Sequence, residues 1–361
     1  MRKIRVLIVD DSAVTLRLIS QFLSEDPEIE VVATAENGEV ALEKVSSLDL
    51  DLVTLDMEMP HMDGLTALKE LQKINPNLPV VMCSNMTEYC AIQTLDALRL
   101  GAKDYVAKPQ NHETSPQSIM LMKEELVRKV KFFGRGPSRP DSAVQLRPTN
   151  GRTRQKFGMR QNTRREPAIV AIGASTGGPE ALNTIISALP ADFPIPILIA
   201  QHMPPVFTRY LADRLCNDSQ LEVVEAEQGE PIEKGKVYIA PGHFHMALEK
   251  NTRKHCINLS QDDLSTGCRP SVDVLFNSVA EIFGPRTIGV VLTGMGQDGV
   301  EGGHDIVSAG GILLAQDKKS SVVWGMPGKL VKAGLTDIVL PIELIASRLT
   351  QLVKQNELAL T

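Results

Sequence analysis

The chain has 361 residues, 43% hydrophobic and 23% charged, enough for two domains that each bury a core. Its formal net charge of -6 argues against a surface built throughout for nucleic acid. The five cysteines are scattered and form no Cys-x-x-Cys pair, so we expect free thiols in a reducing compartment. No apolar run approaches the ~18 residues of a membrane span, and the N-terminus turns acidic before a signal-peptide core could form. We therefore expect a soluble, cytoplasmic protein without direct membrane insertion.

Apolar runs and helical patterns alternate five times over the first 133 residues. The apolar runs are 6–9, 31–33, 52–55, 80–83 and 105–107, and the helical patterns lie near 13–24, 37–47, 64–74, 90–100 and 116–132. Five such repeats predict a parallel, doubly wound sheet. In this architecture ligands bind at the carboxyl ends of the strands.

Charged and hydroxyl side chains gather at these predicted strand ends. Asp10 and Asp11 follow the first strand, Asp56 ends the third, Ser84 the fourth and Lys108 the fifth. Three carboxylates in one crevice repel each other unless a cation lies between them, and Mg²⁺ prefers such oxygen ligands. A carboxylate beside Mg²⁺, a lysine and a hydroxyl can accept a phosphoryl group covalently. A solvated acidic loop would explain one Asp-Asp pair, but not five matched positions.

These positions resemble those of a bacterial two-component receiver domain, over residues 1–133. The matching residues are Asp10, Asp11, Asp56 at the start of Asp-Met-Glu-Met-Pro-His-Met-Asp-Gly, Ser84, Tyr105 and the Lys108-Pro109 pair. The resemblance implies a flavodoxin-like (βα)5 fold, and it implies that a histidine kinase phosphorylates Asp56.

The same resemblance implies a metal site and a switch. The implied Mg²⁺ ligands are Asp10, Asp11, Asp56 and the backbone carbonyl of Glu58. The implied switch residues, which would respond to phosphorylation, are Ser84, Tyr105 and Lys108.

A basic segment, residues 134–165, separates the two halves. From Gly134 through Glu166, both included, there are nine Arg or Lys residues and two acidic ones, a net charge of +7. Low hydrophobicity with this charge leaves too little burial to offset the entropy of ordering, so we expect a mobile tether. An arm that binds nucleic acid is the alternative, but Phe157 is its only aromatic residue for base stacking, and we expect no nucleic-acid partner.

The second half, residues 166–361, begins with an apolar run that ends at Gly173. An amphipathic pattern starts after Gly178 with Pro179, which suits the first position of a helix. Ser175 therefore lies in a strand-to-helix turn, in a Gly-x-Ser-x-Gly sequence typical of a nucleophile elbow. The same turn also occurs for packing alone or as a phosphate cradle, so the function depends on other residues.

Two further strand ends supply partners for Ser175. A predicted strand at 195–200 is followed by His202, and one at 287–292 by a Gly-rich loop that contains Asp298. A histidine can take the proton of a serine hydroxyl, and a carboxylate on the other ring nitrogen fixes its tautomer. Taken singly, His202 would be a core or capping residue and Asp298 an Asx-turn former. Their common place at one sheet edge favours a Ser-His-Asp triad, in an order that differs from the α/β hydrolases.

The second half resembles the catalytic domain of the chemotaxis receptor methylesterase (CheB) family, an α/β fold with a doubly wound parallel sheet. The matching strings are 173–179, 201–204, 240–242, 269–273, 293–296 with 298–299, and 325–328. The resemblance implies that Ser175 is the nucleophile, His202 the base and Asp298 its orienter. The Met295 backbone N-H would lie in the oxyanion hole, and the esterase reaction would need no cofactor.

The implied substrates are glutamyl methyl esters of methyl-accepting chemotaxis receptors, with deamidation of receptor glutamines as a second reaction through the same type of intermediate. We expect a monomer that phosphorylation activates, because an unphosphorylated receiver could cover the crevice around Ser175. Two alternatives remain: a response regulator whose second half only binds nucleic acid or a partner protein, and a serine hydrolase that acts on a small ester.

Overall fold

The structure is a computed structural model, and it describes residues 2–109, 115–135, 166–250, 254–263 and 267–354. The predicted basic tether, 134–165, lies outside the described residues except for its first two positions.

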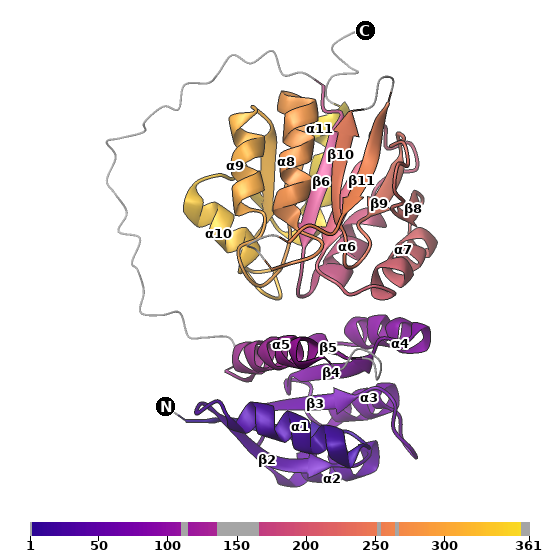
Figure 1. The fold of residues 1–361 in the computed structure, drawn as a ribbon. Coiled ribbons are helices and arrows are strands. Elements are labelled where there is room, and N and C mark those ends of the chain that lie inside the picture. The colour runs from indigo at the N-terminus through magenta and orange to yellow at the C-terminus, as the bar shows by residue number, and fades with distance from the viewer. Residues whose placement is uncertain (1, 110–114, 136–165, 251–253, 264–266, 355–361) are drawn as a thin grey trace, which may run out of the picture. The chain divides into compact units, whose positions relative to one another are not determined.

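The N-terminal domain is the predicted five-fold repeat of strand and helix (Figure 1). Its elements are β1 (Ile4–Val9), α1 (Ala13–Ser24), β2 (Ile29–Ala35), α2 (Gly38–Ser47), β3 (Leu52–Asp56), α3 (Gly64–Ile74), β4 (Val80–Asn85), α4 (Glu88–Arg99), β5 (Asp104–Lys108) and α5 (Pro116–Gly134). The strand order is β2-β1-β3-β4-β5, with parallel pairing of β1 with β2 and β3, and of β3 with β4. The flavodoxin-like fold predicted from the sequence is confirmed.

Each of these helices begins at a side chain that caps it. The residue before the helix accepts a hydrogen bond from the backbone N-H three positions later, which satisfies a donor that the helix itself leaves unpaired. The caps are Ser12, Asn37, Asp63, Thr87 and Ser115. Local chemistry therefore fixes where each helix starts, close to the boundaries expected from periodicity.

The C-terminal domain is built on a seven-stranded sheet. Its elements are β6 (Ile169–Ala174), α6 (Gly178–Ile186), β7 (Ile197–Gln201), α7 (Phe207–Asp218), β8 (Glu222–Glu225), β9 (Lys236–Ile239), β10 (His245–Lys250), β11 (His255–Ser260), α8 (Val272–Phe283), β12 (Thr287–Val291), α9 (Val300–Ser308), β13 (Ile312–Gln316), α10 (Met326–Ala333), β14 (Ile338–Leu340) and α11 (Ile342–Lys354), with a 3-10 turn at Gly284–Arg286. The strand order is β14-β13-β12-β6-β7-β9-β8, and all of its pairings are parallel.

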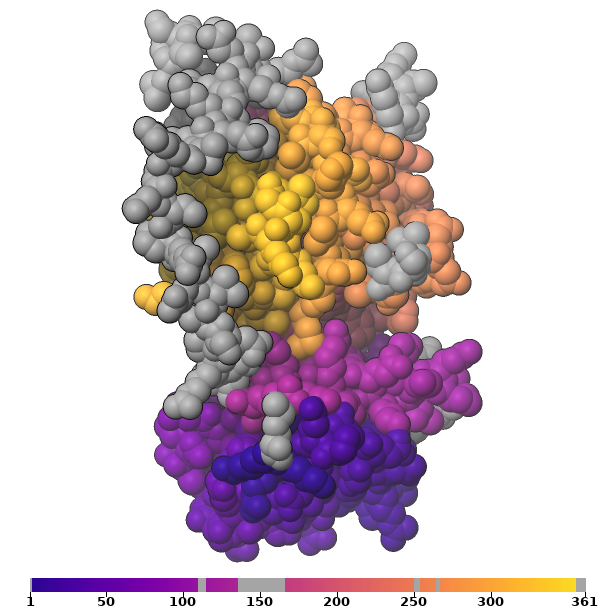
Figure 2. Space-filling model, turned by 90° about the vertical axis from the view of Figure 1, so that its left-hand side faces the viewer, coloured from indigo at the N-terminus to yellow at the C-terminus, as the bar shows by residue number. Residues whose placement is uncertain are grey.

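Helices cover both faces of this sheet. The chain moves from β6 to β7 towards one edge and from β12 to β13 towards the other, so right-handed crossovers place α6 and α9 on opposite faces. Helix α11 packs against α6, while α8 and α10 pack against α9. Figure 2 looks onto the side of α9 and α10, whose orange and yellow atoms form this face of the C-terminal domain. The antiparallel hairpin of β10 and β11 packs through β10 against α8.

The core of this domain lies between the sheet and α8. Phe276, Val279 and Met246 are fully buried there, and burial of each large apolar side chain contributes about 1.5–3 kcal/mol. One predicted boundary is shifted: the strand expected at 195–200 begins at Ile197, since Pro196 has no N-H to donate to a neighbouring strand. Among the helices that the structure describes, none combines the length and the apolar character needed to cross a bilayer.

Candidate functional site

The strand order of the seven-stranded sheet reverses at β6: the chain adds β7, β9 and β8 on one side of β6, and β12, β13 and β14 on the other. Strand β6 pairs with β7 on one side and with β12 on the other, although the chain reaches β12 only after five intervening strands. At such a switch point the loops that follow the two neighbouring strands diverge and leave a crevice at the carboxyl ends. Ser175 follows β6, His202 follows β7 and the loop that contains Asp298 follows β12, so the topology brings the three predicted residues to one edge.

The backbone around Ser175 forms a tight turn. The Ser175 N-H donates to the Thr293 carbonyl at 3.1 Å, and the Gly178 N-H donates back to the Ser175 carbonyl at 2.7 Å. Gly177 has φ of 75°, a left-handed conformation that favours glycine. A Cβ on Gly294 would lie 2.8 Å from the Ser175 Cβ, so this loop approaches the serine as closely as only glycine permits.

The neighbouring strand positions His202. Its backbone N-H donates to the Ala174 carbonyl at 3.0 Å, which extends the pairing of β6 and β7 by one residue. The buried side chain of Gln201 donates from Nε2 to the carbonyls of Ser175 and His202, each at 3.0 Å. Gln201 thereby ties the backbones of the two predicted catalytic residues together.

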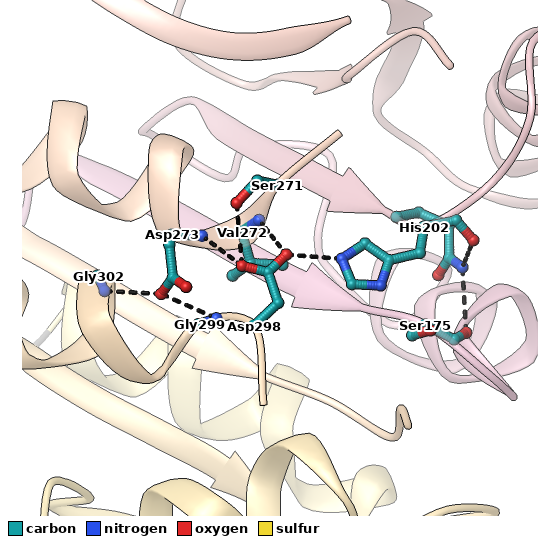
Figure 3. Close-up of polar contacts among 9 residues, drawn as sticks. Ser175, His202, Ser271, Val272, Asp273, Asp298, Gly299 and Gly302 are labelled. Atoms are coloured by element: carbon teal, nitrogen blue, oxygen red, sulfur yellow. Dashed lines mark hydrogen bonds and ion pairs between the residues drawn. The ribbon is translucent and has the colours of Figure 1, made fainter. Parts of the chain in front are cut away.

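His202 and Asp298 contact each other directly. His202 Nε2 lies 2.7 Å from Asp298 Oδ2, and the two side chains are 15% and 5% exposed. If Nε2 carries the proton that it donates to the carboxylate, the lone pair of the imidazole lies on Nδ1. In Figure 3 this second ring nitrogen is on the side of the ring towards Ser175. The orientation is that of a base held in one tautomer.

The Asp298 carboxylate receives three further hydrogen bonds (Figure 3). Oδ2 accepts from the Val272 N-H at 2.7 Å, while Oδ1 accepts from the Asp273 N-H and from Ser271 Oγ, both at 3.0 Å. These donors come from the start of α8. A helix N-terminus offers unpaired N-H groups and a partial positive charge, which stabilise a buried anion.

The electrostatics of the pair favour an ionised aspartate beside a basic imidazole. Burial raises the pKa of Asp298, but the hydrogen bond and charge of His202, with the N-H groups of Val272 and Asp273, outweigh it and hold that pKa well below its ordinary value. Burial conversely lowers the pKa of His202, and the hydrogen bonds to Asp298 and Cys268 outweigh it and raise that pKa. Asp298 therefore increases the proton affinity of the ring.

Two groups at the site remain available to a substrate. Within the described part of the chain, neither Ser175 Oγ nor the Met295 N-H forms a hydrogen bond with another residue. Ser175 and Met295 are both half-buried. The roles predicted for them depend on a bound substrate.

Asp273 links the site to α9. Its Oδ1 accepts the N-H groups of Gly299 and Gly302 at 2.9 and 2.7 Å, and so fixes the turn that follows Asp298. Burial, together with the charge of Asp298, raises the pKa of Asp273 to about 7, although these two N-H groups oppose the shift. At a pH between 3.8 and about 7, Asp273 thus holds a proton that an ordinary carboxyl would lose.

The N-terminal domain contains the predicted acidic cluster. Asp10 and Asp56 are buried and Asp11 is exposed, and one carboxylate oxygen from each lies within 4.8 Å of the others. Asp10 Oδ1 accepts the Ser12 N-H at 3.0 Å, and Asp56 Oδ1 accepts the Met57 N-H at 2.8 Å. An all-oxygen donor set of this size fits a hard cation such as Mg²⁺.

The predicted switch residues lie in the neighbouring strands β4 and β5. Ser84 is fully buried near the end of β4, where its Oγ accepts from Thr94 Oγ1 at 2.8 Å. Tyr105 is 6% exposed within β5, and Lys108 is half-buried at its end. Glu58 is exposed just after β3. The predicted strand ends are thus confirmed, whereas the responses to phosphorylation stay predictions.

Sequence reasoning missed the residues that hold Asp298. Ser271, Val272 and Asp273 lie in a string that matched the family, but nothing in the sequence paired them with a residue 25–27 positions away. It also missed Cys268, whose Sγ lies within 4.8 Å of ligand atoms of His202 and Asp298. Only the loop before α8, which has no periodic signal, brings them there.

Comparisons with known proteins identify the family of each domain. The CheB methylesterase family matches residues 170–349, and the response regulator receiver domain matches residues 6–119. Proteins named protein-glutamate methylesterase/protein-glutamine glutaminase are similar over almost the whole chain. The relative from Trichodesmium erythraeum is 44% identical over 97% of this chain and 99% of its own length, and that from Pyrococcus horikoshii is 41% identical over 98% and 94%.

A solved structure supports the same assignment. The catalytic domain of the CheB methylesterase from Thermotoga maritima is 46% identical and covers 52% of this chain and 100% of its own, with a TM-score of 0.51. The similarity extends over both predicted domains in the full-length relatives. The chain therefore belongs to the CheB family of protein-glutamate methylesterases/protein-glutamine glutaminases that carry a receiver domain.

Proposed function

We propose that this chain hydrolyses glutamyl methyl esters, and deamidates glutamines, of methyl-accepting chemotaxis receptors through Ser175, His202 and Asp298. The observation that carries the proposal is the 2.7 Å contact between His202 and Asp298 at the sheet edge where Ser175 follows β6. Three further donors at the start of α8, Ser271 Oγ and the N-H groups of Val272 and Asp273, hold Asp298 in place, and a module that only binds a partner has no need of a carboxylate oriented in this way.

In the proposed reaction Ser175 Oγ attacks the ester carbonyl while His202 Nδ1 takes the hydroxyl proton. Asp298 stabilises the imidazolium that forms. His202 then gives the proton to the departing methoxide oxygen, which leaves as methanol, and an acyl-enzyme remains on Ser175. Water hydrolyses this ester by the same steps and releases the glutamate. With a glutamine substrate, ammonia replaces methanol as the leaving group.

The tetrahedral intermediate needs donors for its negative oxygen. The Met295 N-H supplies one donor in this proposal, since it donates no hydrogen bond to any other described residue. A fixed N-H aimed at a developing oxyanion typically contributes a factor of about 10²–10³ to the rate. No cofactor is part of the esterase reaction.

In the receiver, Asp56 accepts a phosphoryl group from the chemotaxis histidine kinase. Asp10, Asp11, Asp56 and the Glu58 carbonyl would hold Mg²⁺, which supplies positive charge to the phosphoryl oxygens when it is bound. Lys108 neutralises a further part of that charge. Ser84 and Tyr105 then change conformation, and the receiver surface changes with them.

The proposed domain limits are 1–133 for the receiver, 134–165 for a basic tether and 166–361 for the catalytic domain. A tether raises the effective concentration of the receiver at the catalytic face, so even a contact of low affinity would be occupied often enough to inhibit the esterase. Phosphorylation would release that inhibition. The protein would work in the cytoplasm as a monomer, without nucleic acid.

The test is methanol release from a methylated receptor by the wild type and by two matched variants. Ser175→Ala should lose activity by a factor on the order of 10⁶. Ser187→Ala removes an exposed hydroxyl that only bonds the Asn183 carbonyl, and it should keep the wild-type rate. Equal activity of Ser175→Ala and wild type would overturn the proposal. If the protein hydrolysed small esters but not the methylated receptor, the proposed triad would stand and the proposed receptor substrate would be rejected.

A further inference from the structure

The proposed base lies beside a thiol that the esterase reaction does not use. Cys268 Sγ, a ring nitrogen of His202 and a carboxylate oxygen of Asp298 all lie within 4.8 Å of one another. Cys268 is half-buried and lies three residues before Ser271, in the loop that supplies the donors to Asp298. Three residue types that bind transition metals thus converge where only two are needed for catalysis.

This donor set differs in kind from the acidic cluster of the receiver. The receiver cluster offers oxygen atoms alone, which suit Mg²⁺. Sulfur, imidazole nitrogen and one carboxylate oxygen suit Zn²⁺, which binds them at about 2.3, 2.0–2.1 and 2.0–2.2 Å. A thiolate strongly disfavours Mg²⁺ relative to Zn²⁺. Cellular Mg²⁺ would therefore load the receiver and leave the second cluster empty.

We propose that Cys268, His202 and Asp298 form a Zn²⁺ site that switches the esterase off. The metal takes the place of the proton between His202 and Asp298, and the Cys268 thiol releases its proton as it ligates. Tetrahedral Zn²⁺ holds its nitrogen and oxygen ligands roughly 3.3 Å apart, from the bond lengths above. The present 2.7 Å separation thus needs to widen by only a fraction of an ångström.

Either ring nitrogen gives the same outcome. If Nε2 binds the metal, the proton of the neutral ring moves to Nδ1, and Nδ1 can no longer accept the proton of Ser175. If Nδ1 binds the metal, its lone pair is already used. The hydrogen bonds from Ser271 and the Asp273 N-H to Asp298 Oδ1 remain, and such outer contacts orient a ligating carboxylate. A water molecule would complete the coordination.

Metal binding is independent of the proposed function, whereas the inhibition rests on it. The binding test therefore uses Co²⁺ as a spectroscopic probe on the full-length, chelator-treated protein. A Co²⁺-thiolate bond gives a charge-transfer absorption that oxygen ligands do not produce, so the receiver cluster stays silent. Wild type and Ser175→Ala should both show this band, and Zn²⁺ should displace it.

Two serine variants separate the site from general thiol binding. Cys268→Ser should abolish the band and weaken Zn²⁺ affinity by at least tenfold, since losing a ligand costs no less than the roughly 10–100-fold that losing an outer contact costs. Cys216→Ser, which removes the other half-buried thiol among the described residues, should behave as wild type.

The inhibition test measures receptor demethylation with and without micromolar Zn²⁺, each variant against its own metal-free rate. Wild type and Cys216→Ser should lose most of their activity, and Cys268→Ser should require at least about tenfold more Zn²⁺ for the same loss. Absence of the Co²⁺ band from wild type, or its persistence in Cys268→Ser, would overturn the site. Equal Zn²⁺ sensitivity of all three proteins would overturn the inhibition. Failure of Ser175→Ala to lose activity would instead reject the proposed function, without affecting the band.

Discussion

The receiver and the catalytic domain both place carboxylates at the switch point of a parallel sheet. The receiver groups several carboxylates together, whereas the catalytic domain surrounds one carboxylate with hydrogen-bond donors. In the receiver, Asp10 and Asp11 follow β1 and Asp56 ends the adjacent β3, so one carboxylate oxygen from each lies within 4.8 Å of the others. In the catalytic domain a single carboxylate, Asp298, receives hydrogen bonds from a histidine, a hydroxyl and two backbone N-H groups.

The difference shows how one topology serves two kinds of chemistry. A cluster of like charges gains stability from an added cation and then tolerates a phosphoryl group. A carboxylate that the protein itself compensates needs no added charge, and it acts by orienting its neighbour. The receiver site is thus open to a signal, whereas the catalytic site is assembled in advance.

Among the carboxylates of the two domains, Asp298 should have the largest effect on ester hydrolysis when its charge is removed. Asp298→Asn keeps the shape of the side chain but no longer fixes the tautomer of His202, and kcat should fall by about 10⁴-fold. Because Asp298 raises the pKa of His202, that pKa should also fall in the variant. A titration of His202 by NMR measures it, and an unchanged or higher pKa in Asp298→Asn would break the account of the pair.

Removing the carboxylate of Asp56 should abolish activation by phosphorylation and leave the basal rate of ester hydrolysis unchanged. Asp56→Asn has no nucleophilic oxygen for a phosphoryl group, so a small phosphodonor with Mg²⁺ should neither label it nor stimulate its esterase. Asp49→Asn, which alters an exposed side chain, should be labelled as wild type. Mass spectrometry of the intact proteins checks this, and retained labelling of Asp56→Asn would show that the acidic cluster is not the acceptor.

The smallest of the three expected effects is that of Asp273→Asn, which should alter the pH dependence of stability. Burial and the charge of Asp298 raise the pKa of Asp273 from 3.8 to about 7, so between these values the folded protein retains a proton that the unfolded chain has lost. The free energy of unfolding should therefore fall as pH rises through this window. Asn cannot titrate, so the variant should show a weaker fall.

Urea unfolding at pH 5 and pH 7 measures this difference through Trp324. It is the only tryptophan of the chain and its Nε1 donates to the Gln316 carbonyl, so its fluorescence reports on the catalytic domain. An equal pH dependence in wild type and Asp273→Asn would show that Asp273 ionises normally in the folded protein.

Much of this architecture was predictable because it depends on local patterns. The alternation of apolar runs and helices located β1 to β5, and the Gly-Ala-Ser-Thr-Gly turn placed Ser175 between β6 and α6. His202 and Asp298 could be assigned to strand ends for the same reason. Parallel sheets bring such ends together, so the edge that they share followed from the sequence.

The parts that were missed depend on contacts between distant segments. No periodicity marks the loop before α8, so nothing in the sequence predicted that Ser271 would donate to Asp298 or that Cys268 would lie beside His202. The β10–β11 hairpin is short and packs on α8, and its place outside the main sheet is likewise a tertiary feature. Charge compensation at the site is therefore a property of the fold.

The most direct test of the central claim is whether Ser175 and His202 share one proton-transfer step. Methanol release from a methylated receptor is measured for wild type, Ser175→Ala, His202→Ala and the double variant. Each single variant should lose activity by a factor on the order of 10⁶, and the double variant should be hardly worse than either, because residues that act as a unit are not additive. Losses that multiply in the double variant would show that the two residues act in separate steps, and would contradict the account.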